Sequence, residues 1–136
     1  MNTSIPTGAI NHLALTVTDL ARSERFYTSL LGFQKLMDLS ATRVLLANSG
    51  GVILALTTAP DPTQAPSGDH FNENRVCLDH LSFSVTDHAA LNEAARLFDQ
   101  NGISRGEIKD LTGLKLYVMA FRDPDNIQLE LTAPYA

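Results

Sequence analysis

Two segments of the chain share nearly the same pattern of residues. The first is INHLALTVTD at residues 10–19, and the second is LDHLSFSVTD at residues 78–87. The shared letters align His12 with His80 and Asp19 with Asp87. A repeat of this kind indicates one folding unit used twice, with the two histidines at equivalent places. Paired histidines at equivalent places are suitable ligands for a shared metal ion.

Each copy predicts a βαβββ unit. Alternating apolar and polar residues indicate a first strand, and a helical period follows it, with Asp19 or Asp87 as the N-cap. Gly32 stands where a glycine after the first helix belongs. The predicted strands lie at residues 10–17, 33–39, 43–47 and 52–57 in the first copy, and at residues 78–85, 103–108, 115–122 and 127–132 in the second.

A single unit of this size would leave one sheet face uncovered and bury little core. We therefore expect an α+β fold in which two tandem βαβββ modules form a curled, partly closed mixed sheet, with a concave cleft inside and the helices outside. The predicted domain spans residues 1–136. Module one covers about residues 8–58, a linker rich in Pro, Asp, Asn and Gly covers about 59–75, and module two covers about 76–134.

The totals exclude several classes of protein. A formal charge of −5, with no cluster of Lys and Arg, argues against a nucleic-acid partner. The one cysteine, Cys77, rules out an internal disulfide and a thiolate-rich metal site, and we expect it to be buried. No apolar run is long enough to span a membrane, and the N-terminal residues lack the pattern of a secretory signal peptide. We expect a cytoplasmic protein without a membrane partner.

An acid in the last strand is the third candidate ligand. Glu130 stands between Leu129 and Leu131, and an acid in an apolar strand is costly to bury unless it is paired or bound to a cation. Two imidazoles and one carboxylate leave coordination positions open and suit Fe(II), Mn(II), Zn(II) or Ni(II). Aligning the last strands of the two copies puts Ala55 against Glu130, so the repeat offers no fourth ligand.

These residues carry a family resemblance. HLALTVTD at residues 12–19 and FYTSLLGF at residues 26–33 resemble the opening of the vicinal oxygen chelate superfamily. LDH at residues 78–80 and FRDPD at residues 121–125, followed by Glu130, resemble its second-half signatures. The superfamily includes glyoxalase I, fosfomycin-resistance proteins, bleomycin-resistance proteins and type I extradiol dioxygenases.

The resemblance implies metal ligands at His12, His80 and Glu130. In such proteins the metal chelates two adjacent oxygens of the substrate and stabilises developing negative charge, and Glu130 would then also be catalytic. The glyoxalase I pattern has a second glutamate where this chain has Ala55. A set of two histidines and one glutamate resembles the dioxygenase and fosfomycin-resistance branches instead.

Other polar residues have competing interpretations. His70, in the linker, is either a surface residue or an acid or base folded over the cleft. Tyr117, on an inner strand, is either part of the core or a contact for the substrate. If their side chains contact the cleft, His70 and Tyr117 are candidate catalytic residues. Arg122 next to Asp123 is interpreted as a structural ion pair, and His88 as a solvated residue of the first helical turn.

The leading hypothesis is a metal-dependent enzyme that chelates vicinal oxygens of a small-molecule substrate, with dioxygenase-like chemistry preferred because of Ala55. A glutathione-dependent lyase or transferase, of the glyoxalase or fosfomycin-resistance type, is one alternative. The other is a non-catalytic protein of the bleomycin-resistance type that binds a drug or metabolite. We expect a homodimer, because two-module members of the superfamily are commonly dimeric, and the three ligands could come from one chain or from both.

Overall fold

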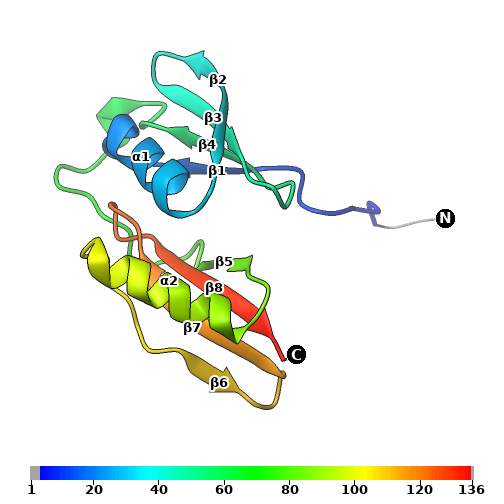
Figure 1. The fold of residues 1–136 in the computed structure, drawn as a ribbon. Coiled ribbons are helices and arrows are strands. Elements are labelled where there is room, and N and C mark those ends of the chain that lie inside the picture. Colours follow the sequence, from blue (N-terminus) through cyan, green and yellow to red (C-terminus); the bar gives the residue numbers. More distant parts are fainter. Residues whose placement is uncertain (1–3, 136) are drawn as a thin grey trace. The chain divides into compact units, whose positions relative to one another are not determined.

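The computed structural model of the protein describes residues 4–135 and shows two compact units (Figure 1). The division falls between Ala65 and Pro66, inside the segment predicted to be a linker. Each unit has the order βαβββ and contains one α-helix and one open four-stranded sheet. The prediction of two tandem βαβββ modules with mixed sheets is confirmed. The cleft expected between them stays a prediction.

The first unit has the sheet order β1-β4-β3-β2, in which β1 runs parallel to β4 and the other neighbours are antiparallel. A short 3₁₀ helix, η1 (Pro62–Gln64), follows the sheet. The elements are β1 (Leu13–Thr16), α1 (Leu20–Leu30), β2 (Gln34–Ser40), β3 (Arg43–Ala47) and β4 (Ile53–Thr57).

The second unit repeats this topology with the sheet order β5-β8-β7-β6, and β5 runs parallel to β8. Its helix lies along one face of the sheet (Figure 1). The elements are β5 (Leu81–Ser84), α2 (His88–Gln100), β6 (Lys109–Leu111), β7 (Leu116–Arg122) and β8 (Gln128–Pro134).

Both helices begin as the repeat predicts. The carboxylate of Asp19 accepts a hydrogen bond from the amide of Arg22 at 3.0 Å. Asp87 accepts one from the amide of Ala90 at 2.9 Å. Each carboxylate satisfies an amide that has no partner within its helix, which stabilises the helix start. After α1 the chain turns at Gly32, whose φ of 73° is costly for any residue with a Cβ.

One aromatic cluster lies under each helix. In the first unit the fully buried Tyr27 makes edge contacts with Phe26 and Phe33. In the second unit Phe98 of α2 packs on Phe121 of β7, with ring centroids 4.4 Å apart. Burial of such side chains stabilises each helix against its sheet by roughly 1.5–3 kcal/mol per residue.

The strand predicted at residues 103–108 is wrong. Only Arg105 forms an isolated bridge there, to Phe121, and the regular strand β6 begins at Lys109. Gly106 interrupts this stretch, and glycine weakens strands because it has no side chain to pack. The segment therefore runs beside β7 through two backbone hydrogen bonds, from the Gly106 amide to the Ala120 carbonyl and from the Arg122 amide to the Ser104 carbonyl.

The first strand of each unit starts later than predicted. β1 begins at Leu13 and β5 at Leu81, so both repeat histidines stand just before a strand. Cys77 lies in the connection before β5 and is exposed, which corrects its predicted burial. Within residues 4–135, no helix has the length and hydropathy needed to cross a membrane.

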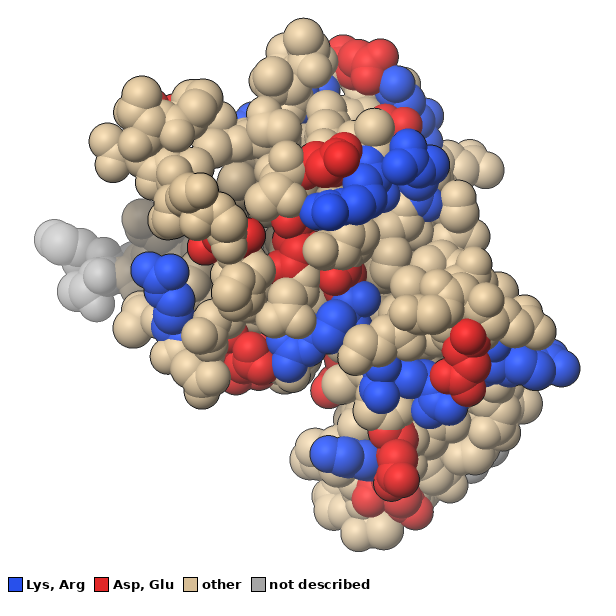
Figure 2. All heavy atoms as spheres, turned by 90° about the vertical axis from the view of Figure 1, so that its left-hand side faces the viewer, with Lys and Arg blue, Asp and Glu red and all other residues tan. Residues whose placement is uncertain are grey.

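Acidic and basic side chains are interspersed on the face shown in Figure 2, and neither sign forms a continuous patch there. This mixture agrees with the absence of a Lys and Arg cluster in the sequence.

Candidate metal-binding site

The candidate site of the second unit lies on the face of its sheet that α2 leaves uncovered. Glu130 of β8 pairs with Ala120 of β7 and with Ser82 of β5. Paired residues project to the same face of a sheet, and neighbours along a strand project to opposite faces. Because Phe121 points to Phe98 of α2, Ala120 and Glu130 point away from the helix.

His80 and Glu130 come together on this face. Their Nε2 and Oε1 atoms are 3.8 Å apart, and the two side chains are 43% and 22% exposed. Two atoms that each lie about 2.1 Å from a shared metal are at most about 4.2 Å apart. The pair therefore has the spacing of two ligands of one ion, and both groups are accessible to it.

The residue before each repeat histidine holds its ring. The Nδ1 atom of His80 lies 2.9 Å from Oδ1 of Asp79, and Nδ1 of His12 lies 2.9 Å from Oδ1 of Asn11. A carboxylate or amide oxygen can only accept a hydrogen bond, so Nδ1 carries the proton in both rings. In the neutral ring this leaves the lone pair on Nε2, the atom that faces Glu130 in the second unit.

A chain of polar contacts continues from Asp79 to the edge of the same face. Nε2 of Gln128 donates to the Asp79 carbonyl at 3.0 Å and to its carboxylate at 3.1 Å. Oε1 of Gln128 accepts from Nη2 of Arg122 at 3.3 Å. Gln128 thus links Arg122 to the aspartate that orients His80.

Arg122 is held by Glu73. Its two terminal nitrogens donate to the two carboxylate oxygens of Glu73, at 2.6 and 3.3 Å. This guanidinium lowers the pKa of Glu73 to about 2 and has its own pKa raised in return. Asp123 accepts the backbone amides of Asp125 and Ile127 and closes the turn before β8, and the predicted ion pair between Arg122 and Asp123 stays a prediction.

The sheet registers show how the first unit differs. Ala55 pairs with Ala14 of β1, as Glu130 pairs with Ser82 of β5. Ala55 thus occupies the register position of Glu130 and carries no ligand atom. His12 stands at the start of β1 with an exposed ring.

Two other sequence candidates lie elsewhere. Tyr117 projects to the face that α2 covers, with its ring centroid 4.6 Å from that of His88 and 4.8 Å from that of Tyr135. Glu130 projects to the opposite face. His70 is exposed in the segment before β5. Catalytic roles for Tyr117 and His70 stay predictions.

Among residues 4–135, the His, Cys, Asp and Glu side chains do not gather in a group of three or more that could hold a metal ion. The second unit contributes the pair of His80 and Glu130, and His12 as a third ligand stays a prediction. Sequence reasoning missed the orienting roles of Asn11 and Asp79, although their place directly before each repeated histidine was a usable signal. No signal pointed to Glu73.

A family model described as the glyoxalase/bleomycin resistance protein/dioxygenase superfamily matches residues 9–131. The chain belongs to this superfamily. The solved structure of a domain of that description from Frankia sp. EAN1pec is similar, with a TM-score of 0.82 and 30% identity over 95% of this chain and 93% of that one. The superfamily match and the shared fold confirm the resemblance inferred from the repeat.

Two curated relatives align with this chain over most of their length. The uncharacterized protein YwkD of Bacillus subtilis is 28% identical over 130 residues, which cover 90% of this chain and 94% of YwkD. The metallothiol transferase FosB of Staphylococcus saprophyticus is 28% identical over 124 residues, which cover 90% of this chain and 75% of FosB.

Proposed function

We propose that this superfamily member is a metal-dependent enzyme that binds a small molecule through two adjacent oxygens. His80 and Glu130 hold the ion, and His12 supplies the third ligand, from the same chain or from a second copy in a homodimer. A divalent ion in such a site acts as a Lewis acid that stabilises negative charge on the bound oxygens. Three protein ligands leave positions open for the substrate.

The approach of His80 to Glu130 carries the proposal. A histidine ring and a carboxylate on one accessible sheet face, 3.8 Å apart, are suited to share a cation. The contact between Asp79 and Nδ1 supports it further, because ligating histidines almost always donate their other ring N–H to an acceptor. This donor set fits Mn(II), Fe(II), Zn(II) or Ni(II).

The reaction class has two candidates. Ala55 removes the fourth ligand of a glyoxalase-type site, which favours dioxygenase-like or transferase chemistry. The similarity to a metallothiol transferase favours transfer of a thiol. Dioxygen uptake with catechol by the Mn(II)- or Fe(II)-loaded protein would support the first candidate. Loss of free thiol from glutathione in the presence of a small electrophile would support the second.

Metal binding by Glu130→Ala tests the proposal. We expect the wild-type protein to bind Mn(II) at the proposed site. Glu130→Ala should lower the Mn(II) affinity by about 100-fold or more, because loss of a direct ligand should cost at least as much affinity as loss of a residue that orients a ligand. Glu107→Ala removes an exposed acid of the same unit and is the matched control.

Calorimetric titration with Mn(II) measures both variants against the wild type. Unchanged affinity in Glu130→Ala and in His80→Ala would refute the proposal. A wild-type protein that binds no divalent metal but does bind an aromatic drug or metabolite would replace it with the sequestration hypothesis.

A further inference from the structure

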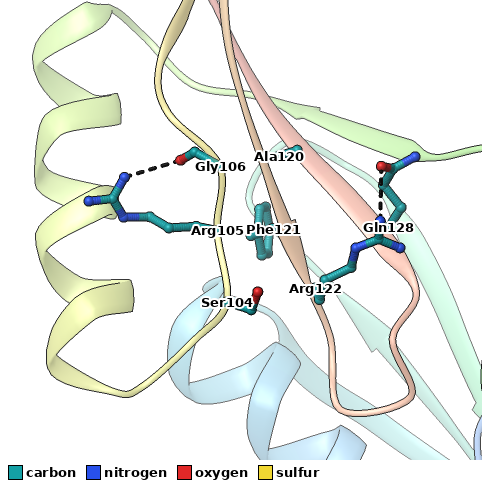
Figure 3. A pocket seen from close by; sticks show the side chains of 7 residues that line it. All are labelled: Ser104, Arg105, Gly106, Ala120, Phe121, Arg122 and Gln128. Atoms are coloured by element: carbon teal, nitrogen blue, oxygen red, sulfur yellow. Dashed lines mark hydrogen bonds between the residues drawn. The ribbon is translucent and has the colours of Figure 1, made fainter.

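The second unit has a hollow lined by residues of β7, β8 and the segment before β6. The hollow has a volume of about 270 Å³ and is lined by Ser104, Arg105, Gly106, Ala120, Phe121, Arg122 and Gln128 (Figure 3). Gly106 lies opposite Ala120 through a backbone hydrogen bond, and Ala120 pairs with Glu130. The hollow is therefore one strand away from Glu130, through the small residue Ala120.

Arg122 supplies the positive charge on this side of the sheet. It projects to the same face as Ala120 and Glu130, because residues two apart in a strand share a face. The side chain of Arg105 instead extends toward α2 (Figure 3). There it donates to both carboxylate oxygens of Asp99 at 2.8 Å. Arg122 pairs with Gln128, so it is a diagonal neighbour of Glu130 in the sheet, at roughly 7–8 Å.

The guanidinium of Arg122 already binds a carboxylate at this place. Glu73 occupies it through two parallel hydrogen bonds, the geometry in which arginine recognises carboxylates most strongly. Glu73 comes from a turn at residues 72–75 whose side chains are mostly exposed. Its side chain is 25% exposed and that of Arg122 is 28% exposed, so solvent and solutes reach the pair.

We propose that Arg122 is a carboxylate-binding subsite of the hollow and that Glu73 occupies it until a substrate carboxylate replaces it. The substrate class rests on the proposed function and follows from the spacing between Arg122 and Glu130. We infer a small molecule that offers two adjacent oxygens to the metal and carries a carboxylate on the opposite side of an aromatic ring. Gln128 connects this subsite to Asp79, and through Asp79 to His80.

Benzoate binding to the metal-free chain tests the subsite separately from the metal. We expect Glu73→Ala to raise the affinity for benzoate about tenfold, because removal of the competing carboxylate frees a charge-assisted hydrogen-bonding site. Asp69→Ala is the matched control, since it removes the same charge from the same segment without touching Arg122. Neutral benzamide should show no gain in Glu73→Ala.

Calorimetry or ligand-observed NMR gives these affinities. The subsite is refuted if Glu73→Ala binds benzoate no better than Asp69→Ala does, or if benzamide gains equally. Arg122→Met should abolish the gain when combined with Glu73→Ala. If the combined variant does not fold, the comparison of Glu73→Ala with Asp69→Ala still decides the question.

The Mn(II)-loaded protein tests the substrate class. We expect 3,4-dihydroxybenzoate to bind more tightly than catechol, by about tenfold in Glu73→Ala and by less in the wild type. Equal affinities of the two compounds in Glu73→Ala would refute the substrate class. Failure to bind Mn(II) at all, with the benzoate result intact, would refute the proposed metal enzyme and leave the carboxylate subsite standing.

Discussion

The two modules of the chain have the same topology and carry different side chains on the sheet faces that their helices leave uncovered. In the second unit this face holds Glu130, Gln128 and Arg122, joined to His80 and Glu73 by polar contacts. In the first unit the position of Glu130 is taken by Ala55, which is 4% exposed. Duplication of a fold therefore does not duplicate a site, because backbone pairing constrains the strands and leaves their side chains on the uncovered face free to diverge.

The two modules also differ in how they hold the repeated histidine. Asp79 holds the ring of His80 through a carboxylate and is itself held by Gln128. Asn11 holds the ring of His12 at the same distance through a neutral amide. A charged acceptor makes the stronger hydrogen bond, so we expect the ring of His80 to be held more firmly than that of His12.

Substitution in an aromatic cluster has the largest expected effect among the tests of this comparison. Phe98 is 1% exposed and packs on Phe121, so Phe98→Ala should cost about 3–5 kcal/mol of stability through lost burial and the cavity left behind. Denaturant unfolding measures the loss, and Leu97→Ala, at an exposed position of the same helix, is the control. A cost below that of Leu97→Ala would show that α2 does not depend on the aromatic pair.

The orienting residues allow a smaller test. Asp79→Ala should weaken Mn(II) binding by about 10–100-fold, because His80 loses the partner that fixes its tautomer and orientation. Asn11→Ala should have a smaller effect, since the lost hydrogen bond is neutral. Asp79→Asn keeps an acceptor oxygen and should recover part of the loss. Equal effects of Asp79→Ala and Asn11→Ala would remove the proposed difference between the modules.

The pair of Glu73 and Arg122, which has no counterpart among the described contacts of the first unit, allows the smallest test. The pKa of Glu73 is lowered from 4.5 to about 2 by Arg122. A carboxyl group with a lowered pKa stabilises the folded state above its ordinary pKa, and this contribution is lost as pH falls toward the folded-state value. The difference in Tm between the wild type and Glu73→Gln should therefore shrink between pH 4.5 and about pH 2, as thermal unfolding monitored by circular dichroism would show. A difference that stays constant over this range would contradict the assignment.

Local features of the fold could be predicted because they depend on neighbouring residues. The caps at Asp19 and Asp87 and the turn at Gly32, with a φ of 73°, follow from short-range chemistry. The strand at residues 43–47 was predicted with the bounds it has in the structure. The strand predicted at residues 103–108 failed because Gly106 interrupts regular pairing and only Arg105 bridges to β7.

The sequence by itself determined the repeated βαβββ unit, its helix caps and the candidate ligands, because each depends on spacing along the chain. The tertiary structure decided which side chains meet. It brought Glu73 to Arg122 across 49 positions of the chain and separated the face of Tyr117 from that of Glu130. It also placed Nε2 of His80 beside Glu130. The repeat located the histidine, and packing of the sheet gave it a partner, because contacts between distant segments depend on strand register rather than on local pattern.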